Sequence, residues 1–303
     1  MPAFDTPEPI VVSLDLGVGD VRITASDRAD TVVDVRPSDP GKEGDVTAAR
    51  QTRVEYSGGR LLIKTSRQRQ YSLTGGRESV DVAIGLPSGS HLQGEAGLAA
   101  LHGAGLLGDV RYKTGAGDID LGMVSTARLR TGAGDVTIDQ VTGQAGQTDV
   151  TTGSGAVRIG RLDCPALVKN SSGDTWIGHA GASLRVKTAN GSISVASSAG
   201  SAEVKTARGD ITVGEVTGGS VSAETSFGAI GIGLPAGLTA WLDLDTSFGN
   251  IRNAIEEAGH PGPAEAPVKV RARTSFGDIT ISRSGAGGAD LPGSLATAEG
   301  EQP

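Results

Sequence analysis

A short glycine-ended tetrad recurs along the chain and constrains its fold more than any other feature. Most copies read Thr, a small residue, a variable residue and Gly, as in TGAG, TARG and TSFG. The steps between the nine final glycines are 17, 21, 18, 18, 18, 19, 21 and 28 residues, so the period is close to 18. Such a regular internal repeat is typical of a solenoid. The nine glycines are Gly117, Gly134, Gly155, Gly173, Gly191, Gly209, Gly228, Gly249 and Gly277.

Each glycine is followed by a segment in which apolar and variable residues alternate. Residues two and four after the glycine are nearly always Ile, Val or Leu, as in DIDL, DVTI and DITV. Alternation with a period of two indicates a strand with one buried face. Another inward candidate lies two residues before the Thr or Asn of each tetrad. We therefore expect each unit to be a strand, a tight corner and a second strand.

A unit of about 18 residues cannot bury its own apolar face, but stacked copies cover one another. The sequence thus predicts an all-β fold, a parallel β-solenoid of about ten turns. At about 4.8 Å per strand its core is about 45 to 50 Å long. The final glycine suits a corner that needs a positive φ or close backbone contact. We expect the Thr column to stack, with its hydroxyl groups bonded to neighbouring turns.

The composition limits both the core and the partners. The chain of 303 residues has 47 glycines but only four Phe, three Tyr and two Trp. Its core must therefore be built from Val, Ile, Leu, Ala and Thr, which favour strands. A net charge of −8 argues against nucleic acid as the partner, since that affinity comes from clustered Lys and Arg. Cys164 is the only cysteine, so no disulfide forms within one chain.

The repeat divides the chain into three expected parts. Residues 1–90 are expected to form a β cap of short strands that covers the N-terminal edge of the solenoid and prevents edge-to-edge pairing. Residues 91–283 hold the solenoid repeats, with a surface excursion at 253–267 that accounts for the 28-residue step. Residues 284–303 are rich in Gly, Ala and Pro and are expected to be a disordered tail.

No catalytic constellation emerges from the sequence. GAGLLG at 103–108 matches a dinucleotide-binding pattern, but a strand and another glycine corner follow where a phosphate-binding helix is needed. An Asp follows many tetrad glycines, but without the double glycine of calcium-binding repeats, so a structural turn is the favoured interpretation. The four histidines lack metal-ligand spacing. We expect no catalytic, cofactor or metal residues and no enzymatic activity.

The outward residue before each tetrad is basic in five of the first six copies. Two interpretations are open: a stripe that attracts an anionic polymer, or a solvated face that offsets the Asp column by roughly a few tenths of a kcal/mol per pair. Trp176, which points outward in DTWI, is the one plausible platform for a sugar in the middle turns. The five basic residues are Lys113, Arg130, Lys169, Lys187 and Lys205.

The third position of the tetrad changes along the chain. It is small or polar in the earlier copies and Phe in the last three, at Phe227, Phe248 and Phe276. Rings about one strand spacing apart predict a local stack at the C-terminal end of the solenoid. A structural stack and a docking patch for a partner are both open, and exposed rings would favour the patch.

Longer segments also resemble a known family. They are DVRITASDRADTVVDVRPS near the start, KTGAGDIDL, TGAGDVTI and VKNSSGDTWIG in the middle, and RARTSFGDITI near the end. Together the chain resembles, over residues 8–283, the bacterial adhesin-like family of β-strand-repeat proteins, a domain of unknown function common in actinobacteria. The resemblance implies a parallel β-helix with no established activity and no known catalytic residues.

Our leading hypothesis is a non-enzymatic scaffold or binding surface with an unidentified protein or polymer partner. The alternatives are a structural polymer that joins through the solenoid edges, and a carbohydrate-binding or carbohydrate-active β-helix. The sequence shows no secretion signal, no complete cell-wall sorting motif and no apolar stretch of about 20 residues that could span a membrane. We therefore expect a cytoplasmic location.

Overall fold

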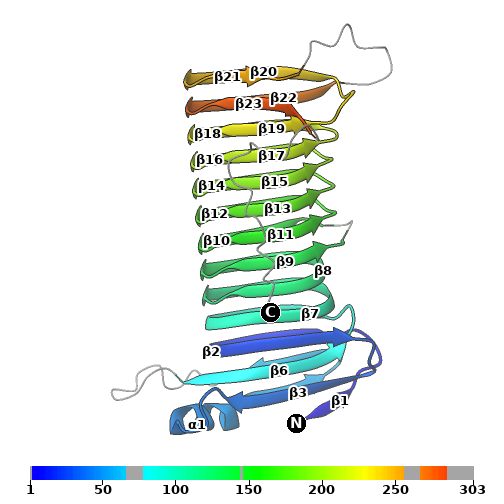
Figure 1. The fold of residues 1–303 in the computed structure, drawn as a ribbon. Helices are drawn as coiled ribbons and strands as arrows, with labels where there is room; N and C mark the ends of the chain where they lie inside the picture. The colour runs from blue at the N-terminus through cyan, green and yellow to red at the C-terminus, as the bar shows by residue number, and fades with distance from the viewer. Residues whose placement is uncertain (1, 66–77, 144–145, 256–266, 285–303) are drawn as a thin grey trace, which may run out of the picture.

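The chain winds into one stack of parallel strands. The computed structural model describes residues 2–65, 78–143, 146–255 and 267–284. Within these ranges the chain forms one helix and 23 strands, and all the strands belong to one continuous sheet. Equivalent strands stack along a single axis with a period close to 18 residues (Figure 1). The predicted all-β parallel solenoid of about ten turns, with a β cap at its N-terminal end, is confirmed.

Each repeat contributes two strands that meet at the tetrad corner. The strand before the corner pairs in parallel with its equivalents above and below, as Val168 does with Val150 and Val186. The first-strand series is β10 (Thr148–Ser154), β12 (Ala166–Ser172), β14 (Leu184–Asn190), β16 (Ala202–Arg208), β18 (Ser220–Phe227), β20 (Ala240–Phe248) and β22 (Val268–Phe276). The second-strand series is β9 (Val136–Val141), β11 (Val157–Leu162), β13 (Thr175–Ala180), β15 (Ile193–Ser198), β17 (Ile211–Val216), β19 (Ile230–Leu234), β21 (Ile251–Asn253) and β23 (Ile279–Arg283).

Rows of aliphatic side chains fill the space between the two series. On β12, Ala166, Val168 and Asn170 are buried, while Lys169 between them is exposed. Burying a side chain such as Val168 contributes about 1.5–3 kcal/mol, and the repeat multiplies that gain along the stack. Tyr112 is the one large ring among the fully buried side chains of the described residues. Burial is the main cause of a raised pKa at the Tyr112 hydroxyl, and the negative charge of Asp20 is the smaller cause.

The corner glycines take a backbone conformation that other residues avoid. Eight of the nine tetrad glycines have φ between 130° and 154°, and Gly249 is the exception. A Cβ added to Gly191 would lie 2.2 Å from the carbonyl oxygen of Gly173 in the preceding turn. Both the positive φ and this contact exclude a side chain, which confirms the expected need for glycine at the corner.

The tetrad threonines join neighbouring turns. The Thr206 hydroxyl donates to the carbonyl oxygen of Gly191 at 3.1 Å, one turn away, and Thr225 makes the equivalent bond to Gly209 at 3.1 Å. Asn170 replaces Thr and donates its amide to Gly155 at 2.9 Å. Each side chain satisfies a buried carbonyl group that the strand ladder leaves unpaired. The column stacks as predicted, but not every hydroxyl group bonds to a neighbouring turn, because the buried Thr188 hydroxyl has no hydrogen-bond partner among the described residues.

The N-terminal elements close one end of the stack. β2 is itself a turn, because it pairs in parallel with β7 from Val11–His91 to Thr24–Ala104. β3 lies antiparallel to β6, β1 lies antiparallel to β3, and α1 packs beside β3 and β6 (Figure 1). The elements are β1 (Ala3–Asp5), β2 (Val11–Ser26), β3 (Asp30–Pro37), α1 (Glu43–Gln51), β4 (Arg53–Ser57), β5 (Arg60–Lys64), β6 (Ser79–Pro87), β7 (His91–Ala116) and β8 (Ile119–Ala133).

The domain boundaries expected from the sequence stay predictions. The cap boundary at residue 90 falls between β6 and β7, but β2 already belongs to the parallel stack. Residues 256–266 of the expected excursion, and all of the expected tail except Ser284, lie outside the described residues.

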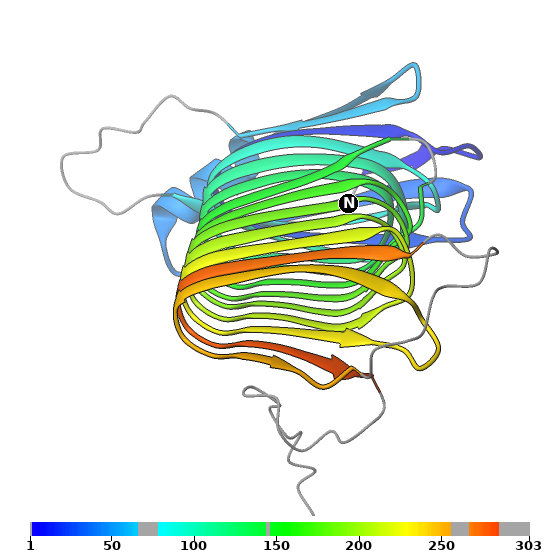
Figure 2. The same ribbon diagram turned by 90° about the horizontal axis from the view of Figure 1, so that it is seen from above.

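The last two turns of the stack are exchanged relative to chain order. β22 pairs with β18 on one side and β20 on the other, and β23 lies between β19 and β21. The chain therefore passes over one strand position, builds the terminal turn from β20 and β21, and returns to fill the position it left. Figure 2, which looks down on the stack, shows these turns in yellow and orange at its near end. β20 and β21 form the free edge of the stack (Figure 1).

We expect Gly191→Ala to lower the free energy of unfolding by about 2 kcal/mol or more. A non-glycine residue with positive φ costs about 1–2 kcal/mol, and the clash with Gly173 adds to that cost. Urea unfolding followed by circular dichroism measures the change. Gly17→Ala is the matched control, because Gly17 has no positive φ and no atom within 4 Å of an added Cβ. Equal losses in the two variants would contradict the assignment of the corner.

Candidate binding surface

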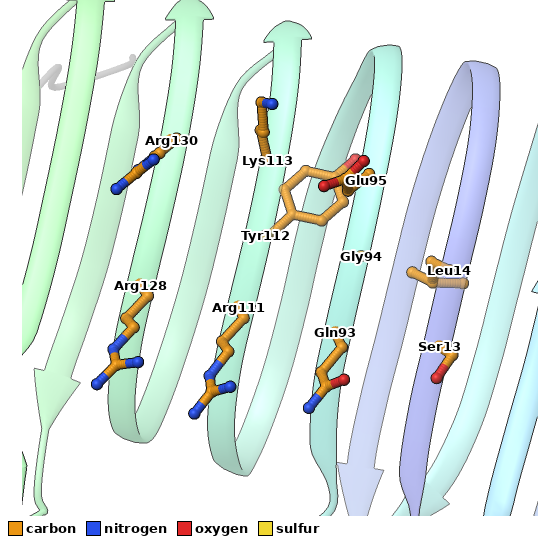
Figure 3. A pocket seen from close by; sticks show the side chains of 10 residues that line it. All are labelled: Ser13, Leu14, Gln93, Gly94, Glu95, Arg111, Tyr112, Lys113, Arg128 and Arg130. Atoms are coloured by element: carbon orange, nitrogen blue, oxygen red, sulfur yellow. The ribbon is translucent and has the colours of Figure 1, made fainter.

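The outward side chains of the first-strand series, and of the equivalent stretches of β2, β7 and β8, form two parallel rows. The basic row lies one residue before each tetrad and contains all five basic residues singled out from the sequence, with Thr151 between Arg130 and Lys169. The members of the basic row are, in order, Lys113, Arg130, Thr151, Lys169, Lys187 and Lys205. The second row lies two residues earlier and begins with Ser13, Gln93, Arg111 and Arg128, which Figure 3 shows. It continues with Asp149, Leu167, Arg185 and Glu203.

At the C-terminal end of these rows the basic side chains are paired. The Lys205 Nζ lies 2.9 Å from Glu224 and 3.7 Å from Glu203. The hydrogen bond to Glu224 is the main cause of a raised pKa at Lys205. Arg185 of the second row likewise lies 2.7 Å from Glu203. These cations are neutralised within the fold, so Lys205 is the weakest member of the predicted surface.

The other members of the basic row make no ion pair within the described residues. Lys113, Arg130, Lys169 and Lys187 have no Asp or Glu oxygen within 4.0 Å, and neither do Arg111 and Arg128 of the second row. Parallel pairing sets Lys169 directly beside Lys187. Like charges directly opposite one another on a sheet are destabilising. The fold therefore maintains an unfavourable arrangement that a bound anion would relieve.

A hollow of about 470 Å³ lies where both rows are basic. Arg111 and Lys113 on β7 lie beside Arg128 and Arg130 on β8, so four cations from two adjacent strands line it (Figure 3). Glu95 is the one carboxylate among its lining residues. A smaller hollow of about 210 Å³ adjoins it through Gln93 and Arg111. The charge of the larger hollow is therefore strongly positive on a protein that is acidic as a whole.

Arg111 and Arg128 were not among the residues expected from the sequence. The signal was present in RYKTG and RLRTG, because residues two apart on a strand share one face. The position directly before each tetrad identifies Lys113 and Arg130, but it does not include Arg111 and Arg128, which lie two residues earlier. The structure brings the two rows together into one surface.

The three phenylalanines form a continuous stack. Phe276 lies between the other two, 5.0 Å from Phe227 and 4.8 Å from Phe248 between ring centroids, with interplanar angles of 2° and 6°. Arg208 extends the stack, with its guanidinium carbon 5.8 Å from the Phe227 ring centroid. The ring stack expected from the sequence is present, in the spatial order 227, 276, 248 that the exchange of turns imposes.

The rings are also exposed, at 50% for Phe227, 45% for Phe276 and 66% for Phe248. Their faces are occupied by neighbouring rings, so solvent meets mainly ring edges. A platform for a sugar or an aromatic ligand needs an open face, which only the outer side of Phe248 provides. This exposure meets the condition that favours a docking patch, which stays a prediction, and the ring contacts also join the terminal turns.

Trp176 lies apart from the basic row. It is on β13, the second strand of its turn, beside Arg158 and Ser194 of the adjacent turns. Its side chain is 45% exposed, and its ring lies over Gly178, where an added Cβ would come within 3.0 Å of it. The ring edge at Cη2 therefore lies close to the Gly178 backbone. Its use as a sugar platform stays a prediction.

The Asp residues after the tetrad glycines bond to the backbone. The Asp118 carboxylate accepts the N–H of Asp135 at 2.9 Å, and Asp174 accepts that of Ser192 at 2.8 Å, each one turn on. These bonds support the structural interpretation of the column. Within the described ranges, no group of three or more His, Cys, Asp or Glu side chains is placed to hold a metal ion.

The GAGLLG segment lies inside β7. The pairing with β8 shifts register between Gly103 and Leu106, and Gly105 has a φ of 83°. This is a bulge in a solenoid corner, and no helix follows it within the described residues. The segment therefore lacks the helix N-terminus that a dinucleotide phosphate site requires.

Comparison with known families assigns the chain. Residues 11–283 match the family described as Toastrack DUF4097. The chain belongs to this family. The match covers the stack from β2 to β23, which includes both basic rows and the phenylalanine stack. An actinobacterial origin, which the sequence resemblance suggested, stays a prediction.

Solved structures similar to this Toastrack chain include proteins from Bacteroides and Parabacteroides. A "putative adhesin" from Bacteroides fragilis NCTC 9343 is 16% identical, with 92% of this chain and 95% of that chain covered and a TM-score of 0.38. A "putative adhesin" from Parabacteroides distasonis ATCC 8503 is 13% identical, with coverages of 93% and 95% and a TM-score of 0.40. A "putative lipid binding protein" from the same organism is 11% identical, with coverages of 92% and 95% and a TM-score of 0.38. No curated protein matches the chain.

The one helix of the described residues, α1, is not long and apolar enough to cross a membrane, and no other candidate span occurs in that part of the chain.

We expect Phe276→Leu to destabilise this Toastrack protein more than Phe248→Leu. The Phe276 substitution removes two stacked ring pairs and the Phe248 substitution removes one, and each pair contributes about 0.5–1.5 kcal/mol. Urea unfolding of both variants measures the difference, and Leu keeps most of the apolar area. If Phe248→Leu lost as much stability as Phe276→Leu, the stack would not hold the exchanged turns together.

Proposed function

We propose that this Toastrack protein is a non-enzymatic binding protein whose basic row holds an extended anionic polysaccharide along the solenoid axis. The observation that supports this most is the run of outward cations that no carboxylate within the described residues neutralises. It extends from Lys113 on β7 to Lys187 on β14. Lys205, the next member, shows that the same fold can neutralise such a position when acidic neighbours are provided.

The spacing of the row favours a linear ligand. Successive members lie about 4.8 Å apart, so the run from Lys113 to Lys187 spans about 19 Å over four strand steps. An extended acidic peptide places side chains on one face about 6.8 Å apart, which does not match this spacing. Single-stranded nucleic acid would also require aromatic rings for its bases, and none lies in either row. A chain of charged sugars avoids both difficulties.

Binding without turnover is the simpler interpretation of this surface. Polysaccharide hydrolysis uses a pair of positioned carboxylates that flank the scissile bond. Among the residues lining the basic hollow only Glu95 is acidic, and the Asp column is bonded to the backbone of the next turn. The sequence expectation of a cytoplasmic location also stays a prediction, and cell fractionation tests it separately.

End-to-end polymerisation has less support. β20 and β21 leave a free edge at one end of the stack, but β1 and β3 run antiparallel at the other end. A head-to-tail polymer needs matching parallel edges at both ends, and the N-terminal end does not offer one.

The proposal predicts that Lys169→Gln/Lys187→Gln weakens binding to polygalacturonate about tenfold at low salt. Two exposed cations contribute up to about 1 kcal/mol each, and salt screens them, so the difference should shrink as salt rises. Biolayer interferometry on the immobilised polymer measures this. Lys205→Gln is the matched control in the same row and should change affinity little, because Lys205 is already paired.

Two outcomes would contradict the proposal. One is binding that Lys169→Gln/Lys187→Gln leaves unchanged, and the other is no binding of polygalacturonate at low salt. A fall in polymer viscosity on incubation with the wild-type protein, absent with heat-denatured protein, would show turnover and overturn its non-enzymatic part.

A further inference from the structure

The hollow lined by Arg111, Lys113, Arg128 and Arg130 differs from the rest of the basic row. Elsewhere the second row adds no unpaired cation, because Arg185 beside Lys187 is paired with Glu203, whereas here both second-row arginines are unpaired within the described residues. We propose that this hollow is a subsite for a tetrahedral oxyanion, a sulfate or phosphate ester, carried by the polysaccharide. The identification of the polysaccharide as the molecule that carries the ester rests on the proposed function, but binding of the oxyanion itself can be tested without the polymer.

Each second-row side chain inside the hollow can donate a hydrogen bond to an anion. This part of the row runs from the Ser13 hydroxyl and the Gln93 amide to the guanidinium groups of Arg111 and Arg128 (Figure 3). These four side chains make no hydrogen bond or ion pair within the part of the chain that the structure describes. Asp149, the next member of the row, ends the series of donors.

The two guanidinium groups suit an ester with three free oxygens. Arg111 and Arg128 are register partners on adjacent strands, and their side chains extend side by side (Figure 3). Each guanidinium group can hold two oxygens in a fork, so two adjacent forks can share a tetrahedral group but exceed the two oxygens of one carboxylate. Lys113 and Arg130 lie two residues further along the same strands and add charge without needing direct contact.

The charge count also favours a dianion. Four cations and Glu95 leave a net charge of about +3 in the hollow. A carboxylate or a sulfate ester would neutralise one of these charges, while a phosphate monoester carries nearly two at neutral pH, so the charge count favours phosphate among the tetrahedral esters. Glu95 lies in line with Lys113 and Arg130, away from Arg111 and Arg128 (Figure 3). The anion therefore sits against the two second-row arginines, where repulsion from Glu95 is weakest.

The first test uses inorganic phosphate and sulfate as the probes. Either ion should raise the melting temperature of the wild-type protein at low ionic strength, and acetate at equal ionic strength should not. Arg111→Gln/Arg128→Gln should abolish this difference and should itself be no less stable than wild type, because it removes a like-charge pair. Arg185→Gln is the matched control, since Arg185 is in the same row but paired with Glu203.

The second test compares dextran sulfate with polygalacturonate and identifies the source of the oxyanion. The wild type should prefer the sulfated polymer, and Arg111→Lys/Arg128→Lys should reduce that preference to about one, because Lys keeps the charge but loses the fork. Polymer binding that depends on Lys169 and Lys187 but shows no such preference would overturn the subsite and leave the proposed function intact. If phosphate stabilised the protein through Arg111 and Arg128 but neither polymer bound, the oxyanion subsite would stand and the polysaccharide would be overturned as the carrier of the ester. Equal stabilisation by acetate would also overturn the subsite.

Discussion

Close contact between the corner backbones of neighbouring turns is the constraint on which the rest of this structure depends. At eight of the nine tetrad corners a glycine of positive φ faces the carbonyl group of the neighbouring turn, as Gly191 faces Gly173. The Thr hydroxyl and the Asp carboxylate bond across the same gap, as Thr206 and Asp174 do. Together these contacts leave no room for a slip of one residue, which would turn the buried side chains outward.

Fixed register converts any repeated outward residue into a row of like side chains about one strand spacing apart. A charged row repels itself unless other groups compensate. The Asp column is compensated by backbone N–H groups, and the C-terminal part of the basic rows by Glu203 and Glu224. In the hollow between β7 and β8, Glu95 offsets one of four positive charges, and none of the four cations has a carboxylate oxygen within 4.0 Å in the described residues. The remaining charge is what the proposed ligand would neutralise.

The sequence predicted what the repeat controls and missed what depends on neighbours. Periodicity alone identified the strands, the corner glycines and the basic row. It did not show that Lys205 would be paired, because that depends on Glu203 and Glu224 lying beside it in space. Arg111 and Arg128 were missed although their spacing from Lys113 and Arg130 was visible. Nor did the repeat reveal the exchanged turns, since either order of stacking preserves the same corners and the same inward residues.

What distinguishes the two orders is the charge of the outward residues. In chain order, β20 with Asp243 and Asp245 would lie directly against β18, which carries Glu224, and carboxylates would face one another. In the observed order β22 lies between them, so Arg273 is opposite Glu224 on one side and Asp245 on the other. Arg271 also bonds to Asp243 at 2.7 Å. The exchange therefore replaces repulsion with alternating charge, whereas the three phenylalanines share one corner column and would stack in either order. The order of the two terminal turns is thus determined by outward side chains that the repeat leaves free to vary. The same is true of the basic hollow near the other end of the stack.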